Sequence, residues 1–169
     1  MYLHPVFDGK THINISLLTA QTRLGYLLSN LAPVGFVMDG VKYSSVEAYW
    51  YELNISNTCP EHLINNLRRM SGTHCKSFGR KLRDKYSLCL VLGFEGMICN
   101  ALRLKVDQNR ELKRLLRLST LPITHYLWSG TKGCPQIKYF QQHYWMCLEY
   151  DRIRDEINGK KDLQMEYII

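Results

Sequence analysis

The stretch from Leu24 to Tyr51 constrains the fold of this 169-residue chain more than any other. An apolar run ends at Ser29-Asn30, and alternating apolar residues then flank Asp39-Gly40. An Asp-Gly pair in that setting predicts a tight β-hairpin, because a type I′ turn needs positive φ at both central residues. The chain then enters Ser44-Ser45-Val46-Glu47, which indicates a helix start. The sequence therefore predicts a hairpin that delivers Glu47 into the first turn of a helix.

The remaining patterns predict a mainly helical α+β fold with one small sheet. Residues 1–23 are mixed and predict an initial strand or extended arm, whereas residues 120–135 are rich in loop residues. Apolar residues recur at helical spacing in residues 61–70, 111–119 and 138–157. They also do so in the apolar stretch that follows a short basic segment starting at Lys76. Helices should therefore supply most of the core, with the hairpin as the sheet.

The size and charge of the chain are those of one basic globular domain. We expect a single domain over residues 1–169, with its core at about 24–157 and a tail at 158–169 that docks or frays. The net charge is +7 and the isoelectric point is near 9.1. That balance fits an anionic partner such as a nucleotide, a phosphate or nucleic acid, and it equally fits simple solubility.

Several function classes are excluded by missing patterns. An apolar run of about 18 residues is absent, so we expect no membrane span, and the N-terminus does not resemble a signal peptide. The six cysteines form no Cys-x-x-Cys pair, which predicts reduced core thiols in a cytoplasmic protein. Walker A, Gly-x-Gly-x-x-Gly and zinc spacings are also absent, so we expect no cofactor and no metal.

Glu47 has two interpretations. Ser44-x-x-Glu47 matches a capping box, in which serine and glutamate satisfy the amides of a helix N-terminus. Alternatively, the carboxylate points into a cleft as a general base or electrostatic stabiliser. In that case the neighbouring aromatic cluster would wall a nucleobase or ribose pocket, or it simply fills the core at helical spacing. The cluster consists of Tyr43, Tyr49, Trp50 and Tyr51.

Three further groups of polar and aromatic residues are candidates for a functional site. Lys76 and Gly79-Arg80 form a basic cluster, and an arginine offers a bidentate fork to phosphate. The competing interpretation is a solvated helix face. Lys105 and Asn109 follow an apolar helical stretch and could be no more than its terminus. His125 and Trp128 lie in a stretch that contains glycines, where a histidine at the edge of the core is as reasonable as a catalytic one.

Taken together and in order, these segments resemble the YbiA-like NADAR family. Its pattern is roughly F-L-S-N-F followed by F-x-x-D-G-x-x-Y-x-S-V-E-H, and this chain matches it with Leu28-Ser29-Asn30, with Phe36 to Asp39-Gly40, and with Tyr43 to Glu47. The later matches keep the family order: Lys76, Gly79-Arg80, Met97 to Leu102, Lys105, Gln108-Asn109, Leu112, Leu115-Leu116 and Trp128. The resemblance covers about residues 24–150.

The resemblance implies an N-glycosidase that cleaves the bond between a base or amine and C1 of a phosphorylated ribose. The implied partners are riboflavin-pathway intermediates or ADP-ribose adducts, including ADP-ribosylated guanine in nucleic acid. Because this cleavage builds positive charge on the sugar, Glu47 would stabilise that charge or activate water. The implied binding residues are Lys76, Arg80 and Lys105 for phosphate, Asn30 for the sugar, Tyr43, Trp50, Tyr86 and Trp128 for stacking, and Asn109 of the shared motif.

The chain departs from the family pattern at several positions. Ala48 stands where the family usually has His, and Tyr86 where it usually has Trp. His125 lies three residues before Trp128, at a position that is acidic in the family, and the acid further upstream is missing. His125 would then replace the second acid, since imidazole can transfer a proton near neutral pH. The alternative is a weakened site that only binds its ligand.

Three hypotheses follow. The first is an N-glycosidase acting on a phosphorylated ribose or an ADP-ribose adduct, with Glu47 and His125 as catalytic residues. The second is a module that binds an ADP-ribose-type nucleotide without turnover. The third is a basic protein that binds nucleic acid, whose affinity would fall steeply with salt.

Overall fold

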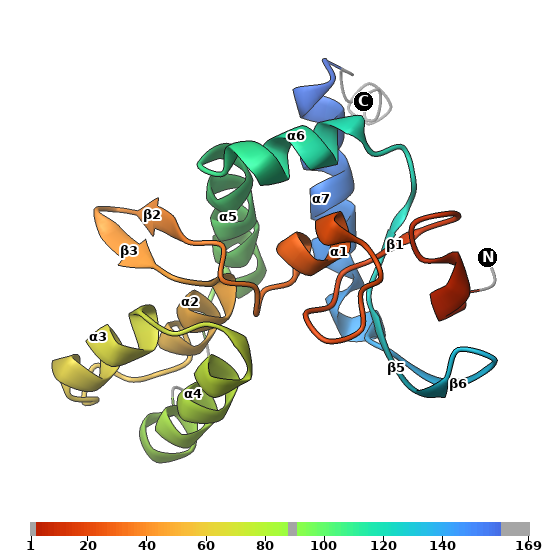
Figure 1. Ribbon diagram of the computed structural model, residues 1–169. Helices are drawn as coiled ribbons and strands as arrows, with labels where there is room; N and C mark the ends of the chain where they lie inside the picture. Colours follow the sequence, from red (N-terminus) through yellow and green to blue (C-terminus); the bar gives the residue numbers. More distant parts are fainter. Residues whose placement is uncertain (1–2, 88–90, 160–169) are drawn as a thin grey trace, which may run out of the picture.

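The predicted hairpin is present in the computed structural model (Figure 1). β2 (Phe36–Met38) pairs antiparallel with β3 (Val41–Tyr43). The turn residues Asp39 and Gly40 have φ values of 50° and 77°, the positive values that a type I′ turn requires. α2 (Val46–Glu52) begins three residues after β3 ends, as expected from the sequence.

The predicted capping box is wrong. The N-cap of α2 is Ser45, whose Oγ accepts a hydrogen bond of 3.2 Å from the amide of Ala48. Ser44 precedes the cap, so it cannot pair with Glu47 across the first turn. The amide of Glu47 instead donates to the carbonyl of Asn30 at 2.9 Å. Helix capping therefore does not account for the carboxylate of Glu47.

The structure describes residues 3–87 and 91–159, in which seven α-helices accompany three separate two-stranded β pairs. The further elements are η1 (Pro5–Phe7), β1 (Ile13–Asn14), α1 (Arg23–Leu28), α3 (Glu61–Arg68), α4 (Gly72–Tyr86), α5 (Phe94–Asp107), α6 (Arg110–Leu118), β4 (Ile123–Thr124), β5 (Tyr126–Thr131), β6 (Cys134–Tyr139), η2 (Gln141–His143) and α7 (Tyr144–Ile157). In this part of the chain no helix is long and apolar enough to span a membrane. The fold is α+β, as predicted, but with three small sheets rather than one.

The prediction of loop for residues 120–135 is wrong. This segment holds β4, all of β5 and the start of β6. The two long strands pair from Tyr126–Tyr139 to Thr131–Cys134 and form a hairpin. The outer half of β5, residues 129–131, is exposed throughout and polar or glycine, so it lacks the alternation of apolar and polar residues by which a strand is recognised.

Two helix starts were also misplaced. α3 ends at Arg68, and α4 begins at Gly72, before the basic segment from Lys76, and runs to Tyr86 as one helix. The last helix starts at Tyr144 rather than near Lys138, because β6 uses the preceding residues. Only the first two residues of the predicted tail at 158–169 lie within the described part of the chain.

The N-terminal segment is tied into the body of the domain by β1. β1 pairs in parallel with β4, so that Ile13 lies opposite Ile123 across more than a hundred residues of sequence. Figure 1 shows this pair beside α1 and α7. Residues just after β1 are thereby brought next to the end of β4. The predicted initial strand is therefore present, but it is only two residues long.

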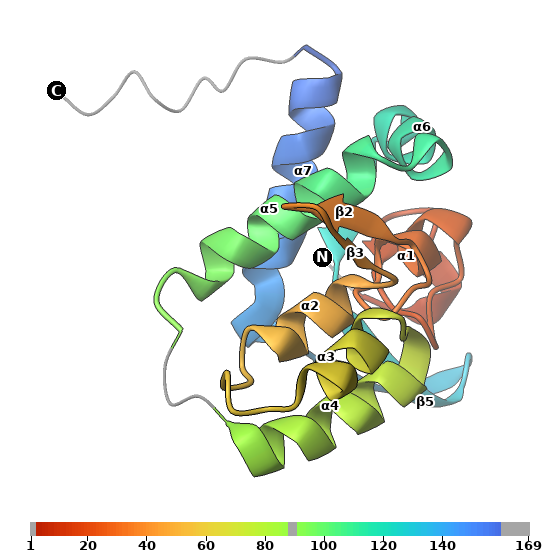
Figure 2. The same cartoon turned by 90° about the vertical axis from the view of Figure 1, so that its left-hand side faces the viewer.

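The core centres on α2 and α5. α2 contacts both α4 and α5, and α5 also contacts α6, α7 and β2 (Figure 2). Val46 and Ala48 of α2 and Ile98 and Leu102 of α5 are fully buried. Burying such side chains is the main favourable term in folding. The start of α2 is therefore anchored on a packed base, which holds Glu47 in a defined position.

The cysteine prediction holds only in part. Cys59, Cys75 and Cys147 are buried free thiols, whereas Cys99 is half-buried and Cys134 is exposed. Cys89 lies outside the described residues. The exposed thiol belongs to the β5–β6 hairpin, which the sequence did not predict.

Gly79 allows α4 to pack directly on α2. A Cβ added at Gly79 would lie 2.3 Å from Cγ of Tyr51, much closer than packed carbon atoms can approach. The ring of Tyr51 thus rests on the backbone of α4, with Arg80 next to this contact in sequence and Lys76 about one turn before it.

We expect Gly79→Ala to lower the free energy of unfolding by about 1–3 kcal/mol, the usual range for overpacking. The added methyl group would push the ring of Tyr51 away, and a gain in helix propensity of about 1 kcal/mol would offset part of the cost. Urea unfolding of the wild type and the variant measures the difference. Gly96→Ala on α5 is the matched control, because a Cβ there would meet nothing within 4 Å. A stabilising Gly79→Ala would contradict the packing described.

Candidate active site

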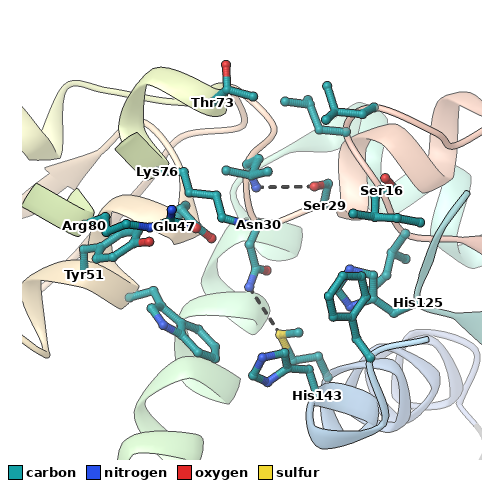
Figure 3. Close-up of a pocket in the computed structure, with 18 of the residues that line it drawn as sticks. Ser16, Ser29, Asn30, Glu47, Tyr51, Thr73, Lys76, Arg80, His125 and His143 are labelled. Atoms are coloured by element: carbon teal, nitrogen blue, oxygen red, sulfur yellow. Dashed lines mark hydrogen bonds between the residues drawn. The ribbon is translucent and has the colours of Figure 1, made fainter. Parts of the chain in front are cut away.

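A cavity of about 460 Å³ lies between α2 and α4 on one side and the ends of β1, β4 and η2 on the other (Figure 3). Figure 3 shows Glu47, Lys76 and Arg80 on one side, His125 on the other, and Asn30 between them. The cavity brings together these residues from the predicted site: Asn30, Glu47, Trp50, Lys76, Arg80 and His125. Their roles stay predictions, but residues up to 95 positions apart in sequence now line one space.

Glu47 presents an uncommitted carboxylate to this cavity. The residue is half-buried, and no hydrogen bond or ion pair joins its carboxylate to a residue in the described ranges. Burial raises the pKa of the carboxyl, and the positive charge of Lys76 opposes that rise. A carboxylate held in this way costs stability unless a ligand or water compensates for it. This is typical of a functional group rather than of a structural one.

Three cations of α4 line the same cavity. Lys76, Arg80 and Arg83 follow one another at spacings of four and three residues, which places them on one face of the helix. Lys76 and Arg80 form no ion pair with a carboxylate of the described residues. By contrast Arg68, outside the cavity, is held by Glu52 with Nη2 to Oε1 at 2.5 Å. The cavity therefore offers cations that the protein itself does not neutralise.

His125 faces the cavity in a neutral state. It lies between β4 and β5, and Nδ1 is buried without a hydrogen-bond partner among the described residues. Burial, together with the nearby positive charges of His143 and Lys76, lowers the pKa of the imidazole to about 4. At pH 7 the ring is therefore uncharged and can accept a proton, but it holds none to donate as an imidazolium acid.

The neutral state of His125 predicts a pH dependence of stability. In the unfolded chain the ring titrates near its ordinary pKa of 6.5, so between about pH 4 and 6.5 the unfolded state binds more protons. We expect the wild type to lose about 2 kcal/mol from this group between pH 7 and 5, and His125→Gln to be spared that loss. Urea unfolding at both pH values measures it, with exposed His62→Gln as control. Equal losses in the wild type and His125→Gln would contradict a buried neutral ring.

Lys105 does not reach the cavity, so it is poorly placed to bind phosphate there. Its fully buried Nζ donates to the carbonyls of Ser29 at 2.8 Å and Leu28 at 3.2 Å. Burial lowers the pKa of the ammonium to about 7. The next residue after Ser29 is Asn30, whose Nδ2 contacts Sδ of Met146 at 3.2 Å in the cavity. Lys105 therefore supports the turn that carries Asn30 rather than a ligand.

Asn109 is likewise used inside the protein. Its Nδ2 donates to the carbonyl of Gly35 at 2.9 Å and to that of Lys105 at 2.6 Å. These bonds join the end of α5 to the start of the hairpin, and Gln108 adds a bond of 2.7 Å from the amide of Val37 to its Oε1. The shared motif around Asn109 thus fastens the hairpin and does not line the cavity.

Three predicted stacking residues also lie away from the cavity. Tyr43 is buried and stacks on Phe36 with ring centroids 5.4 Å apart. Tyr86 is the last residue of α4, and its carbonyl accepts a hydrogen bond of 2.6 Å from the amide of Ser56. Trp128 is turned away because successive residues of a strand face opposite sides, and its Nε1 donates to the carbonyl of Thr19.

Trp50 is the predicted aromatic residue that does line the cavity. It packs edge-on against His143 with ring centroids 5.3 Å apart, and it lies parallel to Trp145 at 6.2 Å. Across the cavity, Phe140 lies 4.6 Å from the ring of His125. The rings of Trp50 and Phe140, together with Leu17, Leu18 and Leu127, make much of the lining apolar.

Sequence reasoning missed several residues of the cavity. Tyr51 was considered only as part of the aromatic cluster, and Arg83 was overlooked although its helical spacing from Lys76 and Arg80 was readable. His143 and Phe140 belong to no recognisable sequence pattern, because only the folding of the chain brings their segment to the cavity. No cluster of three or more metal-ligating side chains occurs within residues 3–87 and 91–159.

Comparison with known proteins gives one informative result. No family model matches the chain, and no curated protein matches it. Among solved structures, it is similar to the NMR structure of the E. coli protein YbiA, with a TM-score of 0.60 and 17% identity over 99% of this chain and 94% of that chain. This similarity confirms the predicted YbiA-like fold. At this identity it shows the fold alone.

Proposed function

We propose that the protein is an N-glycosidase, which hydrolyses the bond between a nitrogen base and C1 of a phosphorylated ribose or of an ADP-ribose adduct. The observation that carries the proposal is Glu47, an unpaired carboxylate in a cavity that also holds unpaired cations. The YbiA-like fold and the family resemblance of the sequence agree with it.

The cavity matches such a substrate by its division into two walls. The α4 wall carries Lys76 and Arg80, which attract a phosphate. The opposite wall carries Phe140 and Leu127, which suit the flat face of a base. Glu47 lies on the same side as Lys76 and Arg80, and Asn30 lies between that side and His125, so a sugar that joins phosphate and base would pass next to both (Figure 3).

The chemistry follows from this placement. As the bond from C1 to nitrogen breaks, positive charge builds on the sugar ring, and the carboxylate of Glu47 stabilises it. A water molecule adds its hydroxide to C1, and its proton ends on the departing nitrogen. His125, neutral at pH 7, orients that water or accepts its proton.

The test is release of free base from a panel of ribosyl compounds. Purified protein is incubated with an aminopyrimidine ribose phosphate, with NAD, and with ADP-ribosylated guanosine, free and within DNA. Products are followed by mass spectrometry. Cleavage of at least one compound at C1 is the expected result. The rates on the free and the DNA-linked adduct are compared to find which form of substrate is cleaved.

Binding without turnover is the second candidate function. It is favoured by one observation, that Glu47 is the one carboxylate among the described residues lining the cavity, so a second acid is missing. Tight binding of a panel compound with no cleavage would support this candidate over the first. Binding of plain DNA, with affinity that falls steeply with salt and no competition by ADP-ribose, would instead indicate a nucleic-acid-binding protein.

A further inference from the structure

The proposed reaction needs a group that gives a proton to the departing base. When the bond between C1 and nitrogen breaks, its electron pair goes to the nitrogen, and a base that carried no positive charge then needs a proton to leave readily. His125 is neutral at pH 7, so it accepts a proton rather than supplying one. Glu47 is assigned to the charge on the sugar. The donor is therefore another side chain of the cavity.

Three ionisable side chains line the cavity without a role in the proposed reaction: Tyr51, Arg83 and His143. The guanidinium of Arg83 does not release its proton in proteins. Burial raises the pKa of Tyr51 above its ordinary value of 10, so its phenol gives up a proton less readily than usual. An imidazole, in contrast, loses and regains a proton near neutral pH. Among the described residues of the cavity, His143 is the suitable donor.

A ring contact with α2 places His143 near Glu47. Trp50 follows Glu47 by three residues in this helix, so their side chains lie on the same face, about one turn apart. The rings of Trp50 and His143 meet edge to face, with centroids 5.3 Å apart and planes at 88°. His143 is therefore separated from Glu47 by one helical turn and one ring contact.

A second set of contacts leads to the same place. Met146 follows His143 by three residues at the start of α7, and its sulfur contacts Nδ2 of Asn30 at 3.2 Å. The carbonyl of Asn30 accepts a hydrogen bond of 2.9 Å from the amide of Glu47. Figure 3 shows the side chain of Asn30 between Glu47 and His143. The amide of His143 also donates to the carbonyl of Phe140 at 3.0 Å, so this histidine joins the wall proposed to hold the base.

The ring of His143 is free to meet a ligand. It is half-buried, and no hydrogen bond or ion pair joins it to a side chain of residues 3–87 and 91–159. Burial lowers its pKa below the ordinary 6.5, Glu95 of α5 opposes that change, and Lys76 of α4 adds to it. His125, its other titratable neighbour, is uncharged. A bound phosphate brings negative charge and so favours the protonated ring when substrate is present.

We propose that His143 is the catalytic acid of the cavity and donates a proton to the departing nitrogen of a base that is uncharged before cleavage. This inference rests on the proposed function. As the bond from C1 to nitrogen breaks, its electron pair stays on the nitrogen, which takes the proton of the His143 imidazolium. Water forms the new bond to C1 and gives its proton to His125. Exchange with solvent then returns both rings to their starting states.

Two leaving groups on the same sugar phosphate test the proposal. One is the neutral base of the panel compound that the wild type cleaves, and the other is 4-nitrophenol, which leaves as a phenolate without a proton. We expect His143→Gln to lower kcat/KM at least about 10²-fold for the base and less than about 3-fold for nitrophenol. Glu47→Gln should lower both, because positive charge builds at C1 in each case. His62→Gln, on the surface of α3 and outside the cavity, should change neither.

The pH dependence of the rate is a second readout, which a merely structural role of the ring would not change. With the neutral base, kcat/KM of the wild type should fall about 10-fold per pH unit above the pKa of His143, which lies below 6.5 in the free protein. His143→Gln should lack this alkaline limb. The nitrophenyl compound should not show it even with the wild type.

The outcomes separate this inference from the proposed function. Equal losses on both leaving groups in a His143→Gln variant whose thermal unfolding is normal, or release of a neutral base without an alkaline limb, would overturn the catalytic acid and leave the glycosidase proposal standing. So would cleavage confined to NAD and the nitrophenyl compound, whose leaving groups need no proton. If nothing is cleaved, the glycosidase proposal fails and this inference fails with it.

Each readout also stands alone. If His143→Gln does not fold, the wild-type pH profiles on the two leaving groups decide. If the nitrophenyl compound is not a substrate, loss of the alkaline limb in His143→Gln decides, and its persistence would refute the proposal.

Discussion

Glu47→Gln is expected to lower the rate of base release at least about 10²-fold, the scale of a positioned acid–base or charge-stabilising group. The amide has nearly the same shape as the carboxylate but cannot balance positive charge at C1. Binding should survive, because the phosphate contacts assigned to Lys76 and Arg80 do not involve this side chain. Rates are measured on whichever panel compound the wild type cleaves, with saturating substrate.

The same substitution should leave the fold at least as stable. Ser45 caps α2, and the carboxylate of Glu47 makes no bond within the described residues, so its neutralisation removes a burial cost. Loss of activity without loss of stability is the signature of a functional residue. Glu61→Gln is the matched control, since Glu61 occupies the first turn of α3 on the surface. Full activity in Glu47→Gln, or unfolding of that variant, would refute the assigned role.

The local part of the fold was readable because it depends on neighbours in sequence. Asp39-Gly40 specifies its turn through the φ values that it tolerates, whatever the rest of the chain does. The helices α5 and α6 carry apolar residues at helical spacing and were predicted as helices. The start of α2 was also predicted, but its cap is Ser45, and two adjacent serines could not be told apart by pattern alone.

The rest of the fold depends on contacts that no local pattern records. The parallel pair of β1 and β4 joins Ile13 to Ile123, and the polar outer half of β5 shows no alternation. The cavity is affected most, since its far wall consists of short segments such as 140–143. Sequence reasoning could therefore find the α2 and α4 side of the site but not what faces it.

Two of the predicted site residues lie outside the cavity for the same physical reason. Lys105 and Asn109 belong to the family-like motif, and both use their nitrogen atoms on backbone carbonyls inside the protein. A motif records that a residue is needed, and it does not distinguish contact with a ligand from support of a residue that makes that contact. Lys105 donates to the carbonyl of Ser29 and so supports the turn there. The next residue is Asn30, whose carbonyl accepts a hydrogen bond from the amide of Glu47. The motif is thereby linked to the site through one turn of backbone.

Burial of Lys105 implies a strong pH dependence of stability. The unfolded chain keeps the proton of this lysine up to about its ordinary pKa of 10.5, whereas the folded chain releases it near 7. Between these values the unfolded state binds more protons, so the free energy of unfolding rises with pH. Once neutral, the amine still has two N–H groups, which match the two carbonyls of Leu28 and Ser29.

We expect this lysine to contribute a rise of about 2 kcal/mol in the free energy of unfolding between pH 7 and 9, and Lys105→Met to abolish it. Methionine keeps the volume of the side chain, so the comparison isolates the proton rather than a cavity. Urea unfolding at pH 7, 8 and 9 measures the slope, and Lys113→Met, at an exposed lysine of α6, should leave it unchanged. If Lys105→Met keeps the wild-type slope, the lysine is not the group that titrates.

Because the turn of Ser29 and Asn30 rests on this amine, Lys105→Met should also weaken ligand binding in proportion to the displacement of Asn30, although Lys105 itself touches no part of the cavity.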